Sequence, residues 1–424
     1  MVIMLFAIFA GLLFLGLPIA FCLGISSAVY LWLADIPLIV IPQKMYSGMD
    51  VFVLLCIPGF ILAGNLMNRG GITDRIVGFC NALVGHIRGG LGLANIVASM
   101  IFAGISGTAV ADTASLGAVL IPAMKKEGYE ADFACAVTAA SSTVGPIIPP
   151  SMPMIIAGTL TSLSVGKLFM AGALPGILLG IGLLIVSYAI SRRRGHPKGE
   201  KVPRRQLFHE FIGAFWALMM TVLILWGIVG GVFSPTEASV VASLYAFLVG
   251  FFIYRDVKLR DLPKIFIDTA VTTASIIVLV GLANLFAWIM TSEQIPQMVA
   301  DALLSVTENK YLILLMINVL LLFVGTFMET IAALLTLFPT LLAVAVQVGV
   351  DPIQFAIIAV LNLMIGLTTP PVGVCLFVAS SIGKISISKI ARANIPFLLV
   401  SIVVLLLVSY IPAISLWLPS LFFK

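Results

Sequence analysis

The fold is decided by two stretches of sequence, Gly145-Pro146-Ile147-Ile148-Pro149-Pro150 and Gly366-Leu367-Thr368-Thr369-Pro370-Pro371. Each stretch interrupts an apolar segment that would otherwise suit a membrane helix. A proline removes a backbone donor and clashes with the preceding turn, so a glycine followed by two prolines ends a helix. Within hydrocarbon, the freed carbonyls must be satisfied by protein, water or an ion. Two helices broken at corresponding positions of two halves indicate the binding site of a transporter.

The composition is that of an integral membrane protein. Of the 424 residues, 61% are hydrophobic and only 10% are charged, whereas soluble domains carry about 25% charged residues. The apolar segments are too long for transmembrane strands, so we predict an all-α protein. The net charge of +5 comes from basic residues in short loops, and no nucleic-acid partner is expected. The five cysteines show no paired spacing, so no disulfide, metal centre or cofactor is expected.

Each break follows a helical hairpin that we expect to enter the membrane without crossing it. The first hairpin spans residues 91–124 and precedes a broken helix over residues 132–160. The second hairpin spans residues 311–346 and precedes a broken helix over residues 352–382. The limbs of both hairpins are shorter than the roughly 20 residues that a full crossing needs. Two re-entrant hairpins and two broken helices are therefore predicted within a bundle of full spans.

A basic segment divides the chain into two halves. Residues 192–205 hold seven Lys/Arg and one Glu, and the positive-inside rule places such a loop in the cytoplasm. We predict a first repeat over residues 1–191, a cytoplasmic linker over residues 192–210 and a second repeat over residues 211–424. The first ten residues have no basic leader or cleavage site, so we interpret them as part of a mature helix.

One offset of 221 residues relates the two halves. The same offset carries the hairpin tip, the hairpin exit and the helix break of the first half onto those of the second half. The corresponding residues are Gly104 and Gly325, Gly128 and Gly349, Gly145 and Gly366, Pro149 and Pro370, and Pro150 and Pro371. Counting spans outward from the basic linker makes the first hairpin open to the cytoplasm and the second open to the outside. The repeats are therefore predicted to be inverted, with both chain termini external. Inverted repeats around a midplane site are an architecture for alternating access.

The hairpin tips and the helix breaks have the chemistry of cation sites. They are rich in Gly, Ser, Thr and free carbonyls and contain no Lys, Arg or His. We expect the tip at 104–108 to meet the break at 145–150, and the tip at 325–329 to meet the break at 366–371. Unwound backbone supplies oxygen ligands for a hard monovalent cation without a buried charge. Two sodium sites are predicted, with an anionic substrate held between them by hydroxyls, helix N-termini and the cations.

Two carboxylates, Asp112 and Glu329, are the charges nearest the tips. A carboxylate at the bilayer centre costs about 2.5–3.5 kcal/mol on insertion scales, so each needs a partner or water. A role in a proton relay and a role as a hydrated charge at a helix end both remain open. Glu237 follows Ser234-Pro235-Thr236 and is predicted to lie in the first turn of a helix, where it favours the dipole.

No enzyme activity is expected. The segment Gly104-Ile105-Ser106-Gly107 resembles the nucleophile motif of an intramembrane serine protease, but such a protease needs a histidine base. His86, His196 and His209 all fall in surface or loop segments. No GxxxxGK[ST] phosphate-binding motif is present, so a gradient rather than ATP must drive transport. A protease at Ser106 and a channel or structural subunit remain as alternatives.

Six short motifs occur in combination along the chain: Gly104–Asp112, Gly145–Ser151, Phe233–Ala238, Thr369–Gly373, Asn68–Ile72 and Gly85–Gly90. With these motifs the chain resembles, over essentially its whole length, the large membrane subunit of tripartite ATP-independent periplasmic (TRAP) transporters. The resemblance implies an elevator-type transporter of the bacterial inner membrane, in which a domain carrying both hairpins slides against a fixed scaffold.

The resemblance also implies function and partners. It implies sodium-coupled uptake of an organic acid, a small four-helix membrane subunit as a separate chain, and a soluble periplasmic protein that delivers the substrate. Sialic acid is favoured over a C4-dicarboxylate. The alternative is a stand-alone sodium–dicarboxylate symporter that needs no partner subunit.

Candidate residues follow from the tips, the breaks and the resemblance together. Transferred residue by residue, the sodium and substrate regions of the family fall on Ser106, Thr108, Gly145, Gly325, Thr326, Gly366, Thr368 and Thr369. The candidate sodium-binding residues are Gly104, Ser106, Gly107, Gly145, Pro146, Gly325, Thr326, Met328, Gly366, Thr368 and Thr369. The candidate substrate-binding residues are Ser106, Thr108, Pro150, Ser151, Asn362, Thr369 and Pro371.

Overall fold

The computed structural model describes residues 2–307 and 309–423, except for the side chains at positions 2, 14, 103–106, 300, 303 and 304. In these residues the regular secondary structure is entirely helical. By length and composition, seven of the described helices are able to cross a membrane, or eight if one bent pair counts as a single span. The predicted all-α membrane fold is confirmed.

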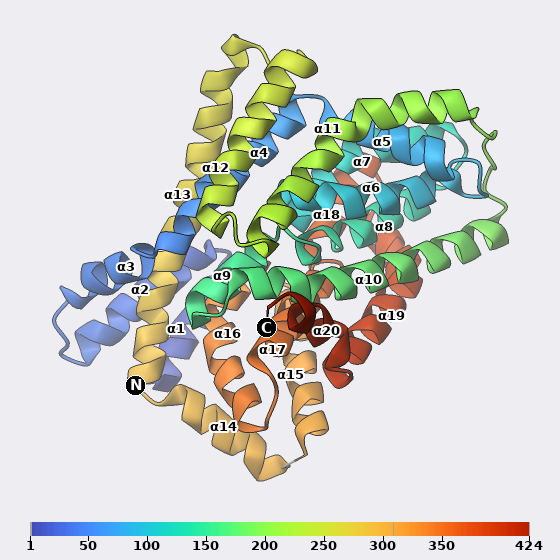
Figure 1. Cartoon of the computed structure of the whole chain (residues 1–424). Coiled ribbons are helices and arrows are strands. Elements are labelled where there is room, and N and C mark those ends of the chain that lie inside the picture. Colours follow the sequence, from blue (N-terminus) through green and yellow to red (C-terminus); the bar gives the residue numbers. More distant parts are fainter. Residues whose placement is uncertain (1, 308, 424) are drawn as a thin grey trace.

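One side of the molecule is a group of helices around the long helix α13 (Figure 1). The group comprises α1 (Val2–Phe14), α2 (Ile19–Leu33), α3 (Val40–Met49), α4 (Cys56–Arg69, preceded by the 3₁₀ turn Phe52–Leu55), α12 (Pro235–Leu248, continued by a π-helical turn, Val249–Ile253) and α13 (Leu262–Ser292). α13 packs against α2, α3 and α4, and α12 packs along α4. The turn at Gly16, with φ of +82°, separates α1 from α2.

The two hairpins and the two interrupted helices form the other body of the molecule. The first hairpin consists of α6 (Gly90–Ser106) and α7 (Ala109–Lys126), and the first interrupted helix of α8 (Ala131–Ser142), the 3₁₀ turn η2 (Gly145–Ile147) and α9 (Met152–Thr161). The second hairpin consists of α15 (Lys310–Gly325) and α16 (Thr330–Gln347), and the second interrupted helix of α17 (Pro352–Gly366) and α18 (Val374–Gly383). The chain bends by 41° between the two parts of the first interrupted helix. Both prolines of each Pro-Pro pair are joined by a cis peptide bond.

Further helices connect and cover these bodies. They are α5 (Ile72–Val84), α10 (Val165–Arg194), α11 (Arg204–Val229), α14 (Ile295–Val306), α19 (Ile387–Tyr410) and α20 (Ala413–Phe422). α5 packs between α6 and α11, while α10 packs against α19 and α20. The short helices α3, α14 and α20 were not predicted from the sequence and are found in the structure. α3 carries Gln43, Lys44 and Ser47, so packing on α13 rather than an apolar pattern accounts for it.

The helix boundaries repeat at the spacing seen in the sequence. Adding 221 carries the bounds of α7, Ala109 and Lys126, onto Thr330 and Gln347, the bounds of α16. The same offset carries Ala131, where α8 begins, onto Pro352, where α17 begins. The repeat is therefore present in the helix plan as well as in the motifs. Its inverted orientation in the membrane and the division into two domains stay predictions.

Polar side chains join each hairpin to its own interrupted helix. Ser141 of α8 lies 2.9 Å from Ser99 of α6, measured between the two hydroxyl oxygens. Asn362, the residue 221 positions further on, donates from Nδ2 to the carbonyl and side-chain oxygens of Asn318 of α15, each at 3.0 Å. Buried polar groups that are satisfied in this way fix a unique packing. Each hairpin and its interrupted helix are thus one packed unit.

The basic linker is attached to the first of these units. The buried His196 side chain lies 2.6 Å, Nε2 to Oε2, from Glu130 in the loop between α7 and α8. Arg194 donates to both carboxylate oxygens of Asp132 at 3.0–3.2 Å. The backbone amide of Gly89 donates to the carbonyl of Pro197 at 3.0 Å. The linker therefore follows the end of the hairpin body on the side that the charge pattern predicts to be cytoplasmic.

Candidate functional site

The second hairpin tip touches the second break through two glycines. A Cβ built on Gly366 would lie 2.5 Å from the carbonyl carbon and 2.8 Å from the carbonyl oxygen of Gly325. Real Cβ atoms do not approach backbone so closely, so only glycine fits at this contact. The amide of Gly373 donates to the carbonyl of Thr326 at 3.0 Å and ties the beginning of α18 to the tip. The structure thus brings together the tip and break that the sequence paired.

Local hydrogen bonds account for the hydroxyls of the second tip and break. Thr326 Oγ1 donates to the carbonyl of Phe323 at 2.7 Å, and Thr368 and Thr369 both donate to the carbonyl of Ile365. Each hydroxyl keeps lone pairs that can accept a further ligand. Met328 and Thr368 are buried, whereas Thr369 is half-buried and Pro371 is exposed. Exposure therefore increases along the second break, from the buried Thr368 to the exposed Pro-Pro pair.

An asparagine that the sequence analysis missed supports the second break. Asn394 of α19 is buried and donates from Nδ2 to the carbonyl of Thr368 at 2.8 Å. Its Oδ1 is buried and has no hydrogen-bond partner in the described part of the chain, and the same is true of Oδ1 of Asn362. An amide oxygen is a suitable ligand for a hard cation. The oxygen atoms around this break are therefore suitable ligands for sodium.

The first hairpin tip meets the first break in a similar way. Gly107 has φ of +65°, and a Cβ built on it would lie 3.0 Å from Cγ of Met152, the first residue of α9. Both limbs of the hairpin contact the 3₁₀ turn that contains Gly145 and Pro146. The Ser151 hydroxyl donates to the carbonyl of Pro146 and accepts from the amide of Met154 at 3.3 Å, which caps α9. Most residues of this break are buried, whereas Pro370 and Pro371 of its counterpart are exposed.

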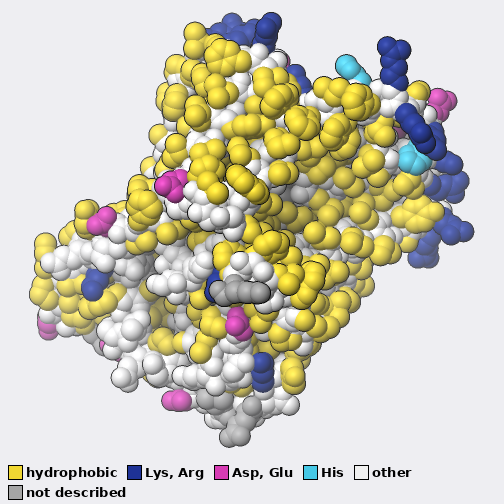
Figure 2. Space-filling view, in the orientation of Figure 1, with side chains coloured by type: hydrophobic (Ala, Val, Ile, Leu, Met, Phe, Trp, Pro, Cys, Tyr) yellow, Lys and Arg dark blue, Asp and Glu magenta, His cyan; other side chains and the backbone are white. Residues whose placement is uncertain are grey.

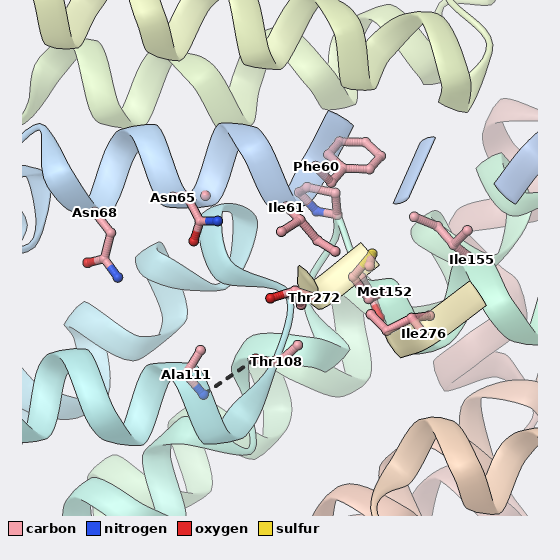
Figure 3. Close-up of a pocket in the computed structure, with 14 residues that line it drawn as sticks. Phe60, Ile61, Asn65, Asn68, Thr108, Ala111, Met152, Ile155, Thr272 and Ile276 are labelled. Atoms are coloured by element: carbon pink, nitrogen blue, oxygen red, sulfur yellow. Dashed lines mark hydrogen bonds between the residues drawn. The ribbon is translucent and has the colours of Figure 1, made fainter. Parts of the chain in front are cut away.

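A cavity of about 190 Å³ opens beside the first tip and break (Figure 3). One wall is formed by the tip, the break and the first turns of the helices that follow: Gly107, Thr108, Ala111, Pro150, Ser151, Met152 and Ile155. The other wall is formed by α4 and α13: Phe60, Ile61, Gly64, Asn65, Asn68, Thr272 and Ile276. Thr108 caps α7 by accepting from the amide of Ala111 at 3.4 Å. The cavity therefore lies between the two bodies of the molecule.

The cavity has polar groups but no charged side chain among its lining residues. Asn65, Asn68, Thr108, Ser151 and Thr272 supply its amides and hydroxyls. Asn65 also donates from Nδ2 to Oγ1 of Thr269 at 2.9 Å, which links α4 to α13 across the wall. Such a site can orient a polar ligand by hydrogen bonds. No cationic side chain in its lining is available to an anion. This agrees with the absence of Lys, Arg and His from the tips and breaks in the sequence.

The predicted substrate residues do not all line this cavity. Thr108, Pro150 and Ser151 do, whereas Thr369 and Pro371 lie at the second break and the Asn362 side chain is directed to Asn318. The side chain of Ser106 and the surroundings of Gly104 lie outside the described residues. The structure thus groups the candidates into two clusters, one at each break, rather than one pocket.

Charged residues adjoin the cavity on one side. A second hollow of about 310 Å³ shares Asn65 and Asn68 with it and is further lined by Arg69, Asp261, Lys264, Ile265 and Asp268. Arg69 donates to Asp261 at 3.1 Å. The hollow therefore places charged residues of α4 and α13 beside the uncharged cavity.

The two tip carboxylates differ in their surroundings. Glu329 is the N-cap of α16, where one carboxylate oxygen accepts from the amides of Ile331 at 2.9 Å and Ala332 at 3.3 Å. Glu329 therefore lies at a helix end, and both roles predicted for it stay predictions. Asp112 lies fully buried in the first turn of α7. Glu237 forms a capping box with Ser234 at the start of α12, as predicted.

Sequence reasoning missed the wall of the cavity that α4 and α13 provide. Asn65 and Thr272 fall inside apolar segments of the chain. Their polarity was the available signal, since a polar residue in a span usually faces a partner or a cavity. The pairing of α4 with α13 links segments some 200 residues apart, which local patterns do not reveal.

The protein has two interrupted helices, each met by a hairpin tip, and a polar cavity between two helical bodies. In a helical membrane protein, this arrangement is typical of a secondary transporter. The chain belongs to the family described as "Tripartite ATP-independent periplasmic transporter, DctM component", whose sequence model matches residues 6–414. It is therefore a large permease of the TRAP type and a multi-pass protein of the inner membrane. The family is one of transporters, and its tripartite organisation implies a small permease and a periplasmic binding protein as partner subunits.

Three known proteins illustrate the relationship. The sialic acid TRAP transporter large permease protein SiaM of Vibrio cholerae is 45% identical over 97% of this chain and 97% of its own length. The C4-dicarboxylate TRAP transporter large permease protein DctM of Rhodobacter capsulatus is 37% identical over 99% of both chains. The crystal structure of the YdaH transporter of Alcanivorax borkumensis matches 90% of this chain and 86% of that chain, with a TM-score of 0.59 and 14% identity. The last likeness concerns the fold alone.

Proposed function

We propose that this permease takes up an organic acid in symport with sodium, through an elevator movement of the hairpin body against the α4–α13 body. The observation that carries the proposal is the uncharged cavity between these bodies, which is lined by Thr108 and Ser151 on one side and Asn65 on the other. An anion in such a cavity needs a positive charge from elsewhere, and bound cations at the neighbouring tips and breaks would supply it. Sodium would then be required for substrate binding.

Sodium is proposed to bind once at each tip and break. The first site would be formed by Gly104, Ser106, Gly107, Gly145 and Pro146, and the second by Gly325, Thr326, Met328, Gly366, Thr368 and Thr369. Support comes from the hydroxyl and carbonyl oxygens at the tips and breaks. It also comes from the buried amide oxygens beside the second break that have no hydrogen-bond partner among the described residues. No resident cofactor is part of the proposal.

The proposed substrate is a sialic acid in preference to a C4-dicarboxylate. The sialic acid permease named above is 45% identical to this chain, against 37% for the C4-dicarboxylate permease. A periplasmic binding protein would deliver the acid from the side on which both chain termini are proposed to lie. A small four-helix subunit would complete the scaffold around α4 and α13.

Reconstitution tests this function. Purified permease is placed in liposomes with or without the small subunit and the binding protein, and uptake of radiolabelled N-acetylneuraminate and of succinate is measured under an inward sodium gradient. We expect uptake of N-acetylneuraminate only when all three components are present. Uptake of succinate by the permease alone would instead establish the stand-alone dicarboxylate symporter.

A substitution tests the second sodium site. Thr369→Val removes a hydroxyl and keeps the side-chain shape, so we expect the sodium concentration for half-maximal uptake to rise about tenfold, the effect of losing one ligand bond of about 1.4 kcal/mol. Thr291→Val, at an exposed position of α13 where the hydroxyl bonds only to the carbonyl of Ala287, is the control. A sodium titration of Thr369→Val that coincides with the wild type would remove Thr369 from the ligand set.

A further inference from the structure

We propose that a groove between α10 and α19, at their basic ends, binds the headgroup of an anionic phospholipid. The groove has a volume of about 290 Å³ and is lined by Ile190, Arg193 and Arg194 of α10 and by Arg392, Ala393 and Pro396 of α19. It shares no lining residue with the cavity at the first hairpin tip. The groove is therefore a separate site, which the transport function does not explain.

The packing of the two helices explains why a groove exists there. A Cβ built on Gly182 would lie 2.6 Å from Cγ1 of Val400, so α10 and α19 touch at this point. Ile190 lies about two turns further along α10, and there the helices leave room between them. Pro396 lies within α19 beside the groove, where its ring interrupts the regular hydrogen bonding of that helix. The groove thus opens at the end of a close helix contact.

Two of the three guanidinium groups at the groove are available to a ligand. Arg194 is occupied, because it binds Asp132 at 3.0 Å and lies 3.6 Å from Glu130. Arg193 and Arg392 form no ion pair within the described residues, and both side chains are exposed. A guanidinium group matches the oxygens of a phosphate with two parallel hydrogen bonds. Two such groups, one from each helix, are therefore positioned for one phosphate.

The surroundings of the groove favour a lipid over a soluble phosphate. Below the arginines, both helices expose large apolar side chains, with Ile185 65% and Leu399 59% exposed. α10 has 30 residues and is about 45 Å long, more than the roughly 30 Å of the hydrocarbon core, so its end reaches headgroup level. Figure 2 shows Lys and Arg gathered at the edge where α10 ends, next to a hydrophobic surface. Acyl chains would lie on this apolar surface while the phosphate meets the arginines.

Lipid titration of the full-length chain tests the proposal. The protein is purified in a neutral detergent, and binding of phosphatidylglycerol is followed by native mass spectrometry and by the rise in unfolding temperature. We expect Arg193→Gln/Arg392→Gln to weaken phosphatidylglycerol binding about 30-fold, from the loss of roughly 1 kcal/mol per basic residue. The matched control, Arg192→Gln/Lys389→Gln, removes the same charge from the same two helices outside the groove and should bind as the wild type does.

Further arms separate the groove from general charge attraction and from soluble anions. Ala393→Trp keeps every charge but fills the groove, and it should weaken phosphatidylglycerol binding as well. Glycerol 3-phosphate at the same concentration should give no rise in unfolding temperature. Three results would each overturn the proposal. They are equal weakening of phosphatidylglycerol binding in the two double variants, unchanged phosphatidylglycerol binding to Ala393→Trp, and an equal rise in unfolding temperature with glycerol 3-phosphate.

Discussion

Gly366 allows the backbone of the second break to touch the backbone of the second hairpin tip. We expect Gly366→Ala to push the tip away, because its Cβ would lie 2.5 Å from the backbone of Gly325. Overpacking of this kind costs about 1–3 kcal/mol, which lowers the unfolding temperature and reduces uptake at least tenfold. Gly213→Ala is the control, because no atom lies within 4 Å of a Cβ at that position. If both variants transport at the wild-type rate, the contact has no role in the site.

Glu130 makes the stability of the protein depend on pH. Burial acts to raise the pKa of Glu130, but its hydrogen bonds with His196 and its own backbone, together with Arg194, lower this pKa below the ordinary 4.5. A carboxyl whose pKa is lower in the folded state stabilises the fold above its unfolded pKa, and this stability is lost as pH falls through the folded pKa. Unfolding temperatures between about pH 7 and pH 3 measure the effect.

We expect the unfolding temperature of the wild type to fall below about pH 4.5. In Glu130→Gln this fall should be smaller. That variant should already be less stable at about pH 7. Glu127→Gln, an exposed neighbour in the same loop, should show the wild-type profile. A Glu130→Gln profile parallel to the wild type at every pH would mean that Glu130 does not contribute to the pH dependence.

At the scale of the element, α19 fixes the second break through one side chain. Asn394→Leu removes the hydrogen bond to the carbonyl of Thr368, and loss of a buried bond of this kind costs about 1–3 kcal/mol. We expect a lower unfolding temperature and a higher sodium requirement, since the break is no longer held in place. Ser401→Ala is the control on α19, because its hydroxyl bonds only within that helix. A normal sodium titration in Asn394→Leu would separate α19 from the cation site.

The elements themselves were predictable to different degrees. Pro-Pro pairs and small polar tips have strong local effects on the backbone, so the hairpins and breaks were predicted close to their observed bounds. α3 and α14 depend on packing rather than on a periodic apolar pattern, and the sequence therefore did not reveal them. Asn65 and Asn394 belong to long apolar segments, and only the three-dimensional contacts show that they face the cavity wall and the second break.

At the scale of the whole molecule, the two copies of the break are placed differently. The first, with Ser151, is enclosed and faces the cavity, whereas the second exposes Pro371. The sequence predicted one substrate site shared by both copies, since the motifs are alike. At the first break, residues of α4 and α13 form the facing wall of the cavity.

The dependence of accumulation on sodium shows whether bound cations supply the positive charge that the substrate needs. Proteoliposomes with the complete set of subunits are loaded with potassium, and accumulation of N-acetylneuraminate is measured with sodium or with potassium outside at equal ionic strength. We predict accumulation above the external concentration with sodium and none with potassium, because the cavity holds no cationic side chain of its own. Equal accumulation in both media would contradict the account.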